Sequence, residues 1–148
     1  MDQKSTQMFR ITLIAIIQCY QFLGQSQADQ DKIIGVWLNE EGTNKIEIYK
    51  VDDTYSGKIV WIAQLDKHPG VNPKDKNNPD PQKRNRAILG MDIITGLKYS
   101  NGKWINGTIY NPEKGLQVNC KVELSSDTEL SLVASKGPFS QTKVWTKE

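Results

Sequence analysis

The strongest constraint on the fold is a strict two-residue alternation in residues 116–124, LQVNCKVEL. Successive side chains of a strand point to opposite faces, so five apolar side chains share one face and four polar side chains share the other. After a polar turn, residues 129–136 continue the pattern, with apolar side chains at 130, 132 and 134. These two segments are predicted to form a hairpin with one buried face and one solvated face.

Turn signals divide the rest of the chain beyond residue 28 into similar short strands. Asn101-Gly102 separates two of them and favours a two-residue hairpin, because both central residues of that turn need positive φ. Turns at 42–44, 52–54 and 112–115 bring the expected total to about eight strands. Eight antiparallel strands hide their edges by closing into a barrel, whose interior holds side chains or one small ligand. We therefore predict an all-β, antiparallel, up-and-down barrel, with a two-sheet sandwich as the alternative.

The two ends of the mature chain favour closure of the barrel. Gly35-Val36-Trp37 opens the first expected strand, and Lys143 and Lys147 lie on the last one. These strands are neighbours in a closed up-and-down barrel, so a lysine can lie over the Trp37 ring, a contact worth about 0.5 to 1 kcal/mol when exposed. The simpler alternative is that Trp37 fills the core. Both alternatives give Trp37 and the lysines a structural role.

Residues 1–28 are interpreted as a cleaved export signal and are left out of the fold argument. Lys4 and Arg10 precede an apolar run that is too short to cross a bilayer, and small residues at 26–28 provide a cleavage point. The remaining residues, 29–148, are a normal length for one domain and contain no segment apolar enough to span a membrane. We expect a single-domain protein in the periplasm or outside the cell.

Charge, cysteine and histidine content narrow the chemistry. The N-terminal segment carries two of the 19 basic and one of the 17 acidic residues, so the rest is nearly neutral, which argues against a nucleic-acid partner. Cys120 is the one cysteine left after cleavage, and its place in the alternating strand favours a buried apolar role. His68 is the only histidine, so no catalytic triad and too few zinc ligands are available. The sequence predicts no catalytic residue, metal site or cofactor.

The longest expected connection joins the third and fourth strands and includes residues 75–86, DKNNPDPQKRNR. Asp80 followed by Pro81 is typical of a helix start, since the aspartate caps a free N–H and proline needs no donor there. Asn77 and Asn78 supply an Asx-type turn before it. One short helix is therefore predicted in this loop. Asp75 also begins a run of oxygen ligands, but the glycine and glutamate that an EF-hand needs are missing, so calcium is not predicted.

Several motifs resemble, in order and spacing, the bacterial family called domain of unknown function 2147 (DUF2147). They are GVWL at 35–38, IEIY at 46–49, GKIVW at 57–61, DKNNPDP at 75–81, RNR at 84–86 and GTIYNP at 107–112. The resemblance covers essentially all of 29–148. It implies an exported protein with a calycin-like, lipocalin-like barrel and no established activity, and Gly35-x-Trp37 is similar to the calycin closure signature. Family members often carry cysteines at the positions of Val51 and Ser56 and a carboxylate at that of Asn111, which this chain lacks.

Two arrangements of the loop arginines remain open. Arg84 and Arg86 either pair with Asp75 or Asp80 and hold the loop on the barrel, or they offer a fork to a carboxylate or phosphate of a ligand. In the second arrangement, an aromatic wall would complete the ligand site. Its candidate residues are Trp61, Tyr99, Trp104 and Tyr110. The same aromatic residues are equally suited to filling the core.

The leading hypothesis is a non-enzymatic, exported barrel that binds a small, partly apolar or lipid-like molecule at the end covered by residues 75–86. The alternative is a structural or protein-interaction module of the cell envelope with a solidly packed barrel. An enzyme of unknown reaction is the third hypothesis. An enclosed space of about 300 Å³ or more favours the first over the second, because ligand pockets have at least that volume.

Overall fold

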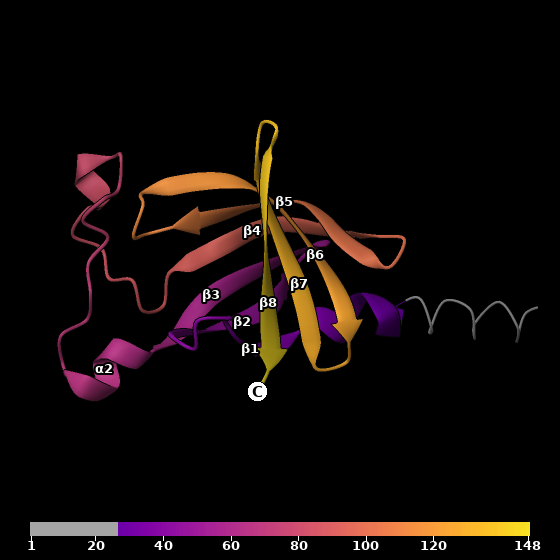
Figure 1. Ribbon diagram of the computed structural model, residues 1–148, viewed down its shortest axis with the longest axis horizontal. Coiled ribbons are helices and arrows are strands. Elements are labelled where there is room, and N and C mark those ends of the chain that lie inside the picture. Colours follow the sequence, from indigo (N-terminus) through magenta and orange to yellow (C-terminus); the bar gives the residue numbers. More distant parts are fainter. Residues whose placement is uncertain (1–26) are drawn as a thin grey trace, which may run out of the picture. The chain divides into compact units, whose positions relative to one another are not determined.

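The computed structural model describes residues 27–148 and divides the chain into two units, Met1–Lys32 and Ile33–Glu148. The expected signal peptide lies outside the described residues except for its last two positions, 27 and 28. Within the described part of the chain, no helix has the length and apolar character needed to cross a membrane. The second unit contains the whole barrel (Figure 1).

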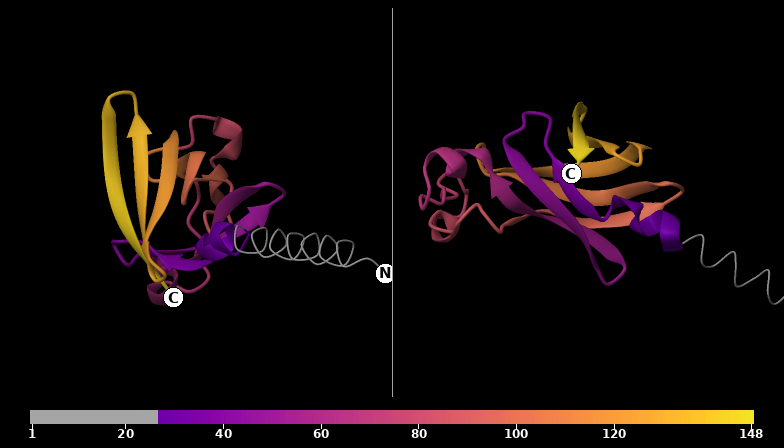
Figure 2. Two further views of the ribbon diagram at one scale, coloured as in Figure 1. Left: turned by 90° about the vertical axis from the view of Figure 1, so that its right-hand side faces the viewer. Right: turned by 90° about the horizontal axis from the view of Figure 1, so that it is seen from below.

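Eight antiparallel strands form the barrel, each paired with its neighbours in sequence, and β1 pairs with β8 to close it (Figure 2). The strands are β1 (Gly35–Leu38), β2 (Asn44–Val51), β3 (Thr54–Ile62), β4 (Asp92–Ser100), β5 (Lys103–Asn111), β6 (Leu116–Ser126), β7 (Glu129–Lys136) and β8 (Phe139–Lys147). The predicted up-and-down barrel is confirmed, and the sandwich alternative is wrong. A 3-10 turn, η1 (Asp31–Ile33), precedes β1.

The β3–β4 connection contains two short helical segments, α2 (Ala63–Lys67) and η2 (Pro81–Lys83). The second one is the short helix predicted from Asp80-Pro81, and the Asp80 side chain accepts a hydrogen bond from the Gln82 N–H at 3.0 Å. The first one was not predicted. Apart from an isolated antiparallel bridge between Lys74 and Ala87, the rest of this connection runs without regular structure to β4.

The hairpins predicted from alternation and turn residues are confirmed. β6 pairs with β7 with Cys120 opposite Ala134, so the apolar faces of both strands point into the barrel. Asn101 and Gly102 take φ values of 50° and 79°, as their two-residue turn requires. The β2–β3, β4–β5 and β6–β7 turns lie at one end of the barrel, here called the packed end. The other four connections lie at the opposite, open end.

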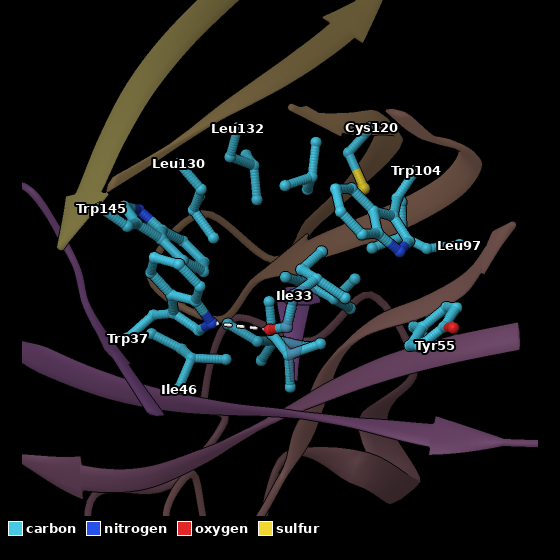
Figure 3. Close-up of a cluster of buried hydrophobic side chains, with 14 of the residues drawn as sticks. Ile33, Trp37, Ile46, Tyr55, Leu97, Trp104, Cys120, Leu130, Leu132 and Trp145 are labelled. Carbon is cyan, nitrogen blue, oxygen red and sulfur yellow. Dashed lines mark hydrogen bonds between the residues drawn. The ribbon is translucent and has the colours of Figure 1, made fainter. Parts of the chain in front are cut away.

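Large side chains fill the interior at the packed end (Figure 3). Trp37 is fully buried, and its Nε1 donates a 2.9 Å hydrogen bond to the carbonyl of Ile33. Trp104 packs edge-on against Tyr55, with ring centroids 6.4 Å apart. The centroid of the Tyr99 ring lies 5.2 Å from that of Trp104. Such aromatic contacts add to the stabilisation from apolar burial. This end is therefore a conventional hydrophobic core.

The seam between β1 and β8 carries the lysines singled out in the sequence. Lys147 pairs with Trp37 across the seam, and its Nζ lies 5.2 Å from the centroid of the Trp37 ring. Lys143 lies earlier on β8. Its Nζ is 2.5 Å from a carboxylate oxygen of Glu41 and 3.5 Å from one of Glu40. Trp37 thus combines the two roles that the sequence left open, since it fills the core and lies beneath a lysine.

A β-bulge places Trp61 outside the barrel. Ile59 pairs with Ile46, but Trp61 pairs with Lys45, so Val60 is an extra residue in β3. The extra residue reverses the alternation, because side-chain direction has a period of two. Lys45 Nζ consequently lies 5.3 Å from the Trp61 ring centroid on the outer face.

Candidate functional site

A cavity of about 650 Å³ occupies the open end of the barrel. Its volume falls within the usual range for small-molecule sites, although the cavity is open to solvent at its mouth and is not the enclosed space described above. The deep wall is apolar and comes from six strands. It consists of Ile46, Ile59, Ile62, Ile93, Ile109, Leu132, Ala134 and Trp145. An apolar group can therefore occupy this space without leaving buried polar atoms unpaired.

On β7 the inward-facing side chains become smaller toward the open end, which leaves space for the cavity there. On β7 the inward positions run from Leu130, fully buried at the packed end, through Leu132 to Ala134 at the cavity. On β6 the neighbouring inward position beside the cavity is Val118. Neither Ala134 nor Val118 reaches the middle of the barrel as a tryptophan does at the packed end. The same alternating pattern thus produces a filled half and a hollow half.

Charged side chains surround the mouth of the cavity, where the four open-end connections begin and end. Two are carboxylates and three are lysines. These residues are Glu41, Glu113, Lys114, Lys136 and Lys143. The side-chain hydrogen bond from Lys143 holds the pKa of Glu41 below its usual value, and the bond to Glu41 raises the pKa of Lys143. These two residues therefore form a charged pair at neutral pH.

A buried carboxylate, Asp75, organises the long β3–β4 connection beside the cavity. Its Oδ1 accepts a 2.7 Å hydrogen bond from Tyr110 Oη, and its Oδ2 accepts bonds from Asn78 Nδ2 at 2.7 Å and Arg86 Nε at 2.8 Å. Asp75 is fully buried, so each oxygen needs such partners. These four residues are called the Asp75 cluster below.

The contacts of the cluster lower the pKa of Asp75 and raise the pKa of Tyr110. Burial by itself raises the pKa of Asp75, but hydrogen bonds from Tyr110, Asn78 and Arg86 and the charge of Arg86 together hold that pKa below its ordinary value. Burial and the hydrogen bond to Asp75 raise the pKa of Tyr110. Asp75 is therefore a carboxylate and Tyr110 a neutral phenol at neutral pH.

The same segment is attached to the β5–β6 turn by a second set of contacts. Asn77 Nδ2 donates a 2.7 Å hydrogen bond to the carbonyl of Glu113. Gly115 has φ +61°, and a Cβ there would lie 1.8 Å from the Asn77 carbonyl oxygen, so only glycine allows this approach. Because Glu113 and Tyr110 line the cavity, these contacts fix one side of its mouth.

The two loop arginines make intramolecular contacts. Arg86 binds Asp75, and its guanidinium carbon lies 5.4 Å from the centroid of the Tyr110 ring. Arg84 Nε donates a 2.8 Å hydrogen bond to the carbonyl of Asn78. Asp80 caps η2 and lies 3.6 Å from Lys83. Arg86 thus makes the predicted pair with Asp75, whereas Arg84 pairs with neither Asp75 nor Asp80 and binds a backbone carbonyl instead, and neither arginine lines the cavity.

The structure separates the four aromatic candidates. Tyr110 lines the cavity and contacts Arg86. Trp104 and Tyr99 lie in the packed end, and Trp61 lies on the outer face, where its Nε1 donates to Asp66 at 3.3 Å. Of the six ligand-binding candidates, Tyr110 is the one that lines the cavity, with Arg86 against its ring, while Tyr99 and Trp104 contact each other in the packed end. A ligand-binding role for any of the six stays a prediction.

Sequence reasoning missed the apolar wall and the lysines of the mouth. The decrease in size along β7, from Leu130 to Ala134, is a signal that could have located the hollow half. No comparable signal marks Lys114 and Lys136, because lysines in turns are common whatever their function.

The cysteine and the histidine, which are common in catalytic sites, lie outside the cavity lining. Cys120 is buried between β5 and β7, and burial raises the pKa of its thiol to about 12, which makes it a poor nucleophile. His68 is exposed on the β3–β4 connection. In residues 27–148, no group of three or more histidine, cysteine, aspartate or glutamate side chains is arranged to hold a metal ion.

A closed eight-stranded barrel with an apolar cavity at one end defines a lipocalin-like fold. Among solved structures, the chain is similar to one described as "Protein HP1028 from the human pathogen Helicobacter pylori belongs to the lipocalin family". The match has a TM-score of 0.69 and 20% sequence identity, and it covers 78% of this chain and 82% of that chain. At this identity the likeness concerns the fold alone.

The family follows from the sequence. The profile of the family described as "Uncharacterized protein conserved in bacteria (DUF2147)" matches residues 35–147, almost the whole barrel. The chain therefore belongs to the DUF2147 family, as its motifs suggested. A sequence search of curated proteins gave no match.

Proposed function

We propose that this protein is a non-enzymatic binding protein that holds a small, partly apolar molecule in the cavity at the open end of the barrel. The observation that carries the proposal is the cavity itself, about 650 Å³ with an apolar deep wall. A lipocalin-like fold is typically a binding fold, which agrees with this function. The Asp75 cluster supports the site indirectly by fixing Tyr110 in the wall.

A neutral fluorescent probe, N-phenyl-1-naphthylamine, tests the proposal. The probe brightens in apolar surroundings, so titration with the native-sequence protein should give saturable fluorescence. In Ala134→Trp the added indole fills the cavity, and the affinity should fall at least about tenfold. The matched control is Thr142→Trp, an exposed position on β8 that does not line the cavity. Equal probe binding by Ala134→Trp and the native sequence, or no binding by either, would contradict the proposal. It would favour the alternative, a structural or protein-interaction module of the cell envelope.

We also propose that the protein is exported, with cleavage after Ala28. The support comes from the basic residues, apolar run and small residues of the N-terminal segment. N-terminal sequencing of the protein recovered from its bacterial cell envelope should begin at Asp29. A chain that retains Met1 and stays in the cytoplasm would contradict export without touching the binding proposal.

A further inference from the structure

The polar groups that a bound molecule would meet lie at the cavity mouth and not in its depth. The deep wall is apolar, whereas three lysines and two glutamates line the rim. Moving a charged group into the apolar part would cost several kcal/mol, so a charged end of a ligand would stay at the rim. The charges of the rim therefore select the head group, and the deep wall selects the body.

Two of the five rim charges neutralise each other. Lys143 lies 2.5 Å from Glu41 and 3.5 Å from Glu40, which belongs to the same β1–β2 turn. With two carboxylates around one ammonium group, this side of the mouth offers no cation for a ligand. A head group would have to bind elsewhere on the rim.

The other two lysines are available to a ligand. Lys114 lies in the β5–β6 turn and Lys136 at the end of β7, and both residues line the mouth without an ion pair to any carboxylate in residues 27–148. Glu113 is the remaining rim carboxylate. Outside the Lys143 pair, the rim thus carries two positive charges and one negative charge.

The loop attached to the β5–β6 turn adds to the positive field. Lys74, Lys76 and Arg84 are exposed there and form no ion pair within the described part of the chain, and the carboxylate of Asp75 is already bound to Arg86. Because Asn77 ties this loop to the β5–β6 turn, these residues add positive charge on the side of the molecule where Lys114 lies.

We propose that the ligand is amphipathic and anionic, with its apolar body in the depth of the cavity and a carboxylate or phosphate group held between Lys114 and Lys136. This inference rests on the proposed binding function and adds the chemical class of the ligand. A carboxylate and a phosphate share the negative charge and acceptor oxygens that lysines bind, so the two are separate arms of one test.

Competition against bound N-phenyl-1-naphthylamine measures the head-group preference. The competitors share a twelve-carbon chain and differ at one end: dodecanoate, dodecyl phosphate, dodecanol and dodecyltrimethylammonium, all below their micelle concentrations. Dodecanoate or dodecyl phosphate should displace the probe at about fivefold to tenfold lower concentration than dodecanol, as expected for two exposed ion pairs. Higher salt should reduce this advantage.

A double variant assigns the preference to the proposed lysines. In Lys114→Gln/Lys136→Gln the anionic competitors should lose their advantage, while dodecanol displaces the probe as before. The matched control, Lys98→Gln/Lys121→Gln, removes the same charge from exposed lysines outside the mouth and should keep the preference.

Three results are distinguishable. Equal potency of dodecanol and dodecanoate, or a stronger effect of the ammonium compound, would overturn the anionic head group and leave the binding function standing. An advantage that survives in Lys114→Gln/Lys136→Gln would refute the assignment to these lysines. If the native-sequence protein binds neither the probe nor any dodecyl compound, the proposed function itself fails, and this inference with it.

Discussion

The two ends of the barrel are built from the same alternating strands but carry different contents. At the packed end, Trp37, Trp104 and Tyr55 fill the interior and are at most 1% exposed. At the open end, Ile109 and Ala134 border a cavity of about 650 Å³. The strand pattern therefore determines the barrel, whereas the size of the inward residues determines which half is hollow.

This contrast implies a division of labour. Aromatic burial at the packed end supplies much of the stability, since each large aromatic side chain buries roughly 150 to 250 Å² of surface away from water. The open end needs a different support, because its long connection has little core of its own. The buried Asp75 and its partners provide that support at the side of the cavity.

The largest expected contrast comes from truncating one residue at each end. Trp104→Ala should lower the free energy of unfolding by about 3 to 5 kcal/mol, because it opens a cavity in a filled core. Ile109→Ala should cost about 2 kcal/mol or less, because that side chain is half-buried and already borders empty space. Urea unfolding followed by circular dichroism measures both. Equal losses would mean that the two ends do not differ in packing.

Removal of the charge on Asp75 should have the next largest effect. Asp75→Asn places an amide N–H₂ against donors from Arg86 and Asn78, and we expect a loss of about 2 to 3 kcal/mol in urea unfolding. Asp80→Asn is the matched control, since asparagine caps a helix equally well, and it should change stability by less than about 0.5 kcal/mol. Similar losses in the free energy of unfolding for both variants would show that the buried carboxylate of Asp75 stabilises the fold no more than the exposed one of Asp80.

Acid should weaken the open end through the same carboxylate. The pKa of Asp75 in the folded protein lies below its ordinary value of 3.8. The stabilisation by this group is therefore complete above the unfolded-state pKa and is lost as pH falls through the lower folded-state pKa. Urea midpoints at pH 6, 4, 3 and 2 should fall more steeply for the native sequence than for Asp75→Asn. Parallel curves would exclude Asp75 as the source of acid sensitivity.

The smallest predicted effect concerns the closing seam at Trp37. Lys147→Gln removes the charge 5.2 Å from the Trp37 ring centroid and should cost about 0.5 to 1 kcal/mol. Lys98→Gln, an exposed position on β4, is the control and should have a smaller effect. If the two variants unfold at the same urea concentration, the cation–π contact between Lys147 and Trp37 does not contribute to stability.

The barrel could be predicted because its signals are local. Alternation in residues 116–124, the Asn101-Gly102 turn and the Asp80-Pro81 cap each depend on residues adjacent in sequence. The position of Trp61 could not be predicted in the same way. Its direction depends on a bulge, and a bulge is set by the pairing of β3 with β2 and not by β3 alone.

The candidate site was predictable only in part. The sequence identified the loop and the Asp75 partner of Arg86, but not the Asn78 carbonyl that Arg84 binds. Tyr110 lies 35 positions from Asp75, and nothing in either segment indicates their hydrogen bond. The cavity is less predictable still, because it depends on the combined volume of side chains from six strands. Volume inside a barrel is a property of packing, and sequence periodicity reports only direction.

The central claim is that a small molecule binds at the open end while the packed end remains unchanged. Isoleucine methyl NMR during titration with N-phenyl-1-naphthylamine tests it directly, because the chain places isoleucines at both ends. Ile59, Ile93 and Ile109 border the cavity and should shift, whereas Ile33 and Ile48 in the filled core should stay in place. Equal shifts at both ends, or shifts confined to the core pair, would contradict the account.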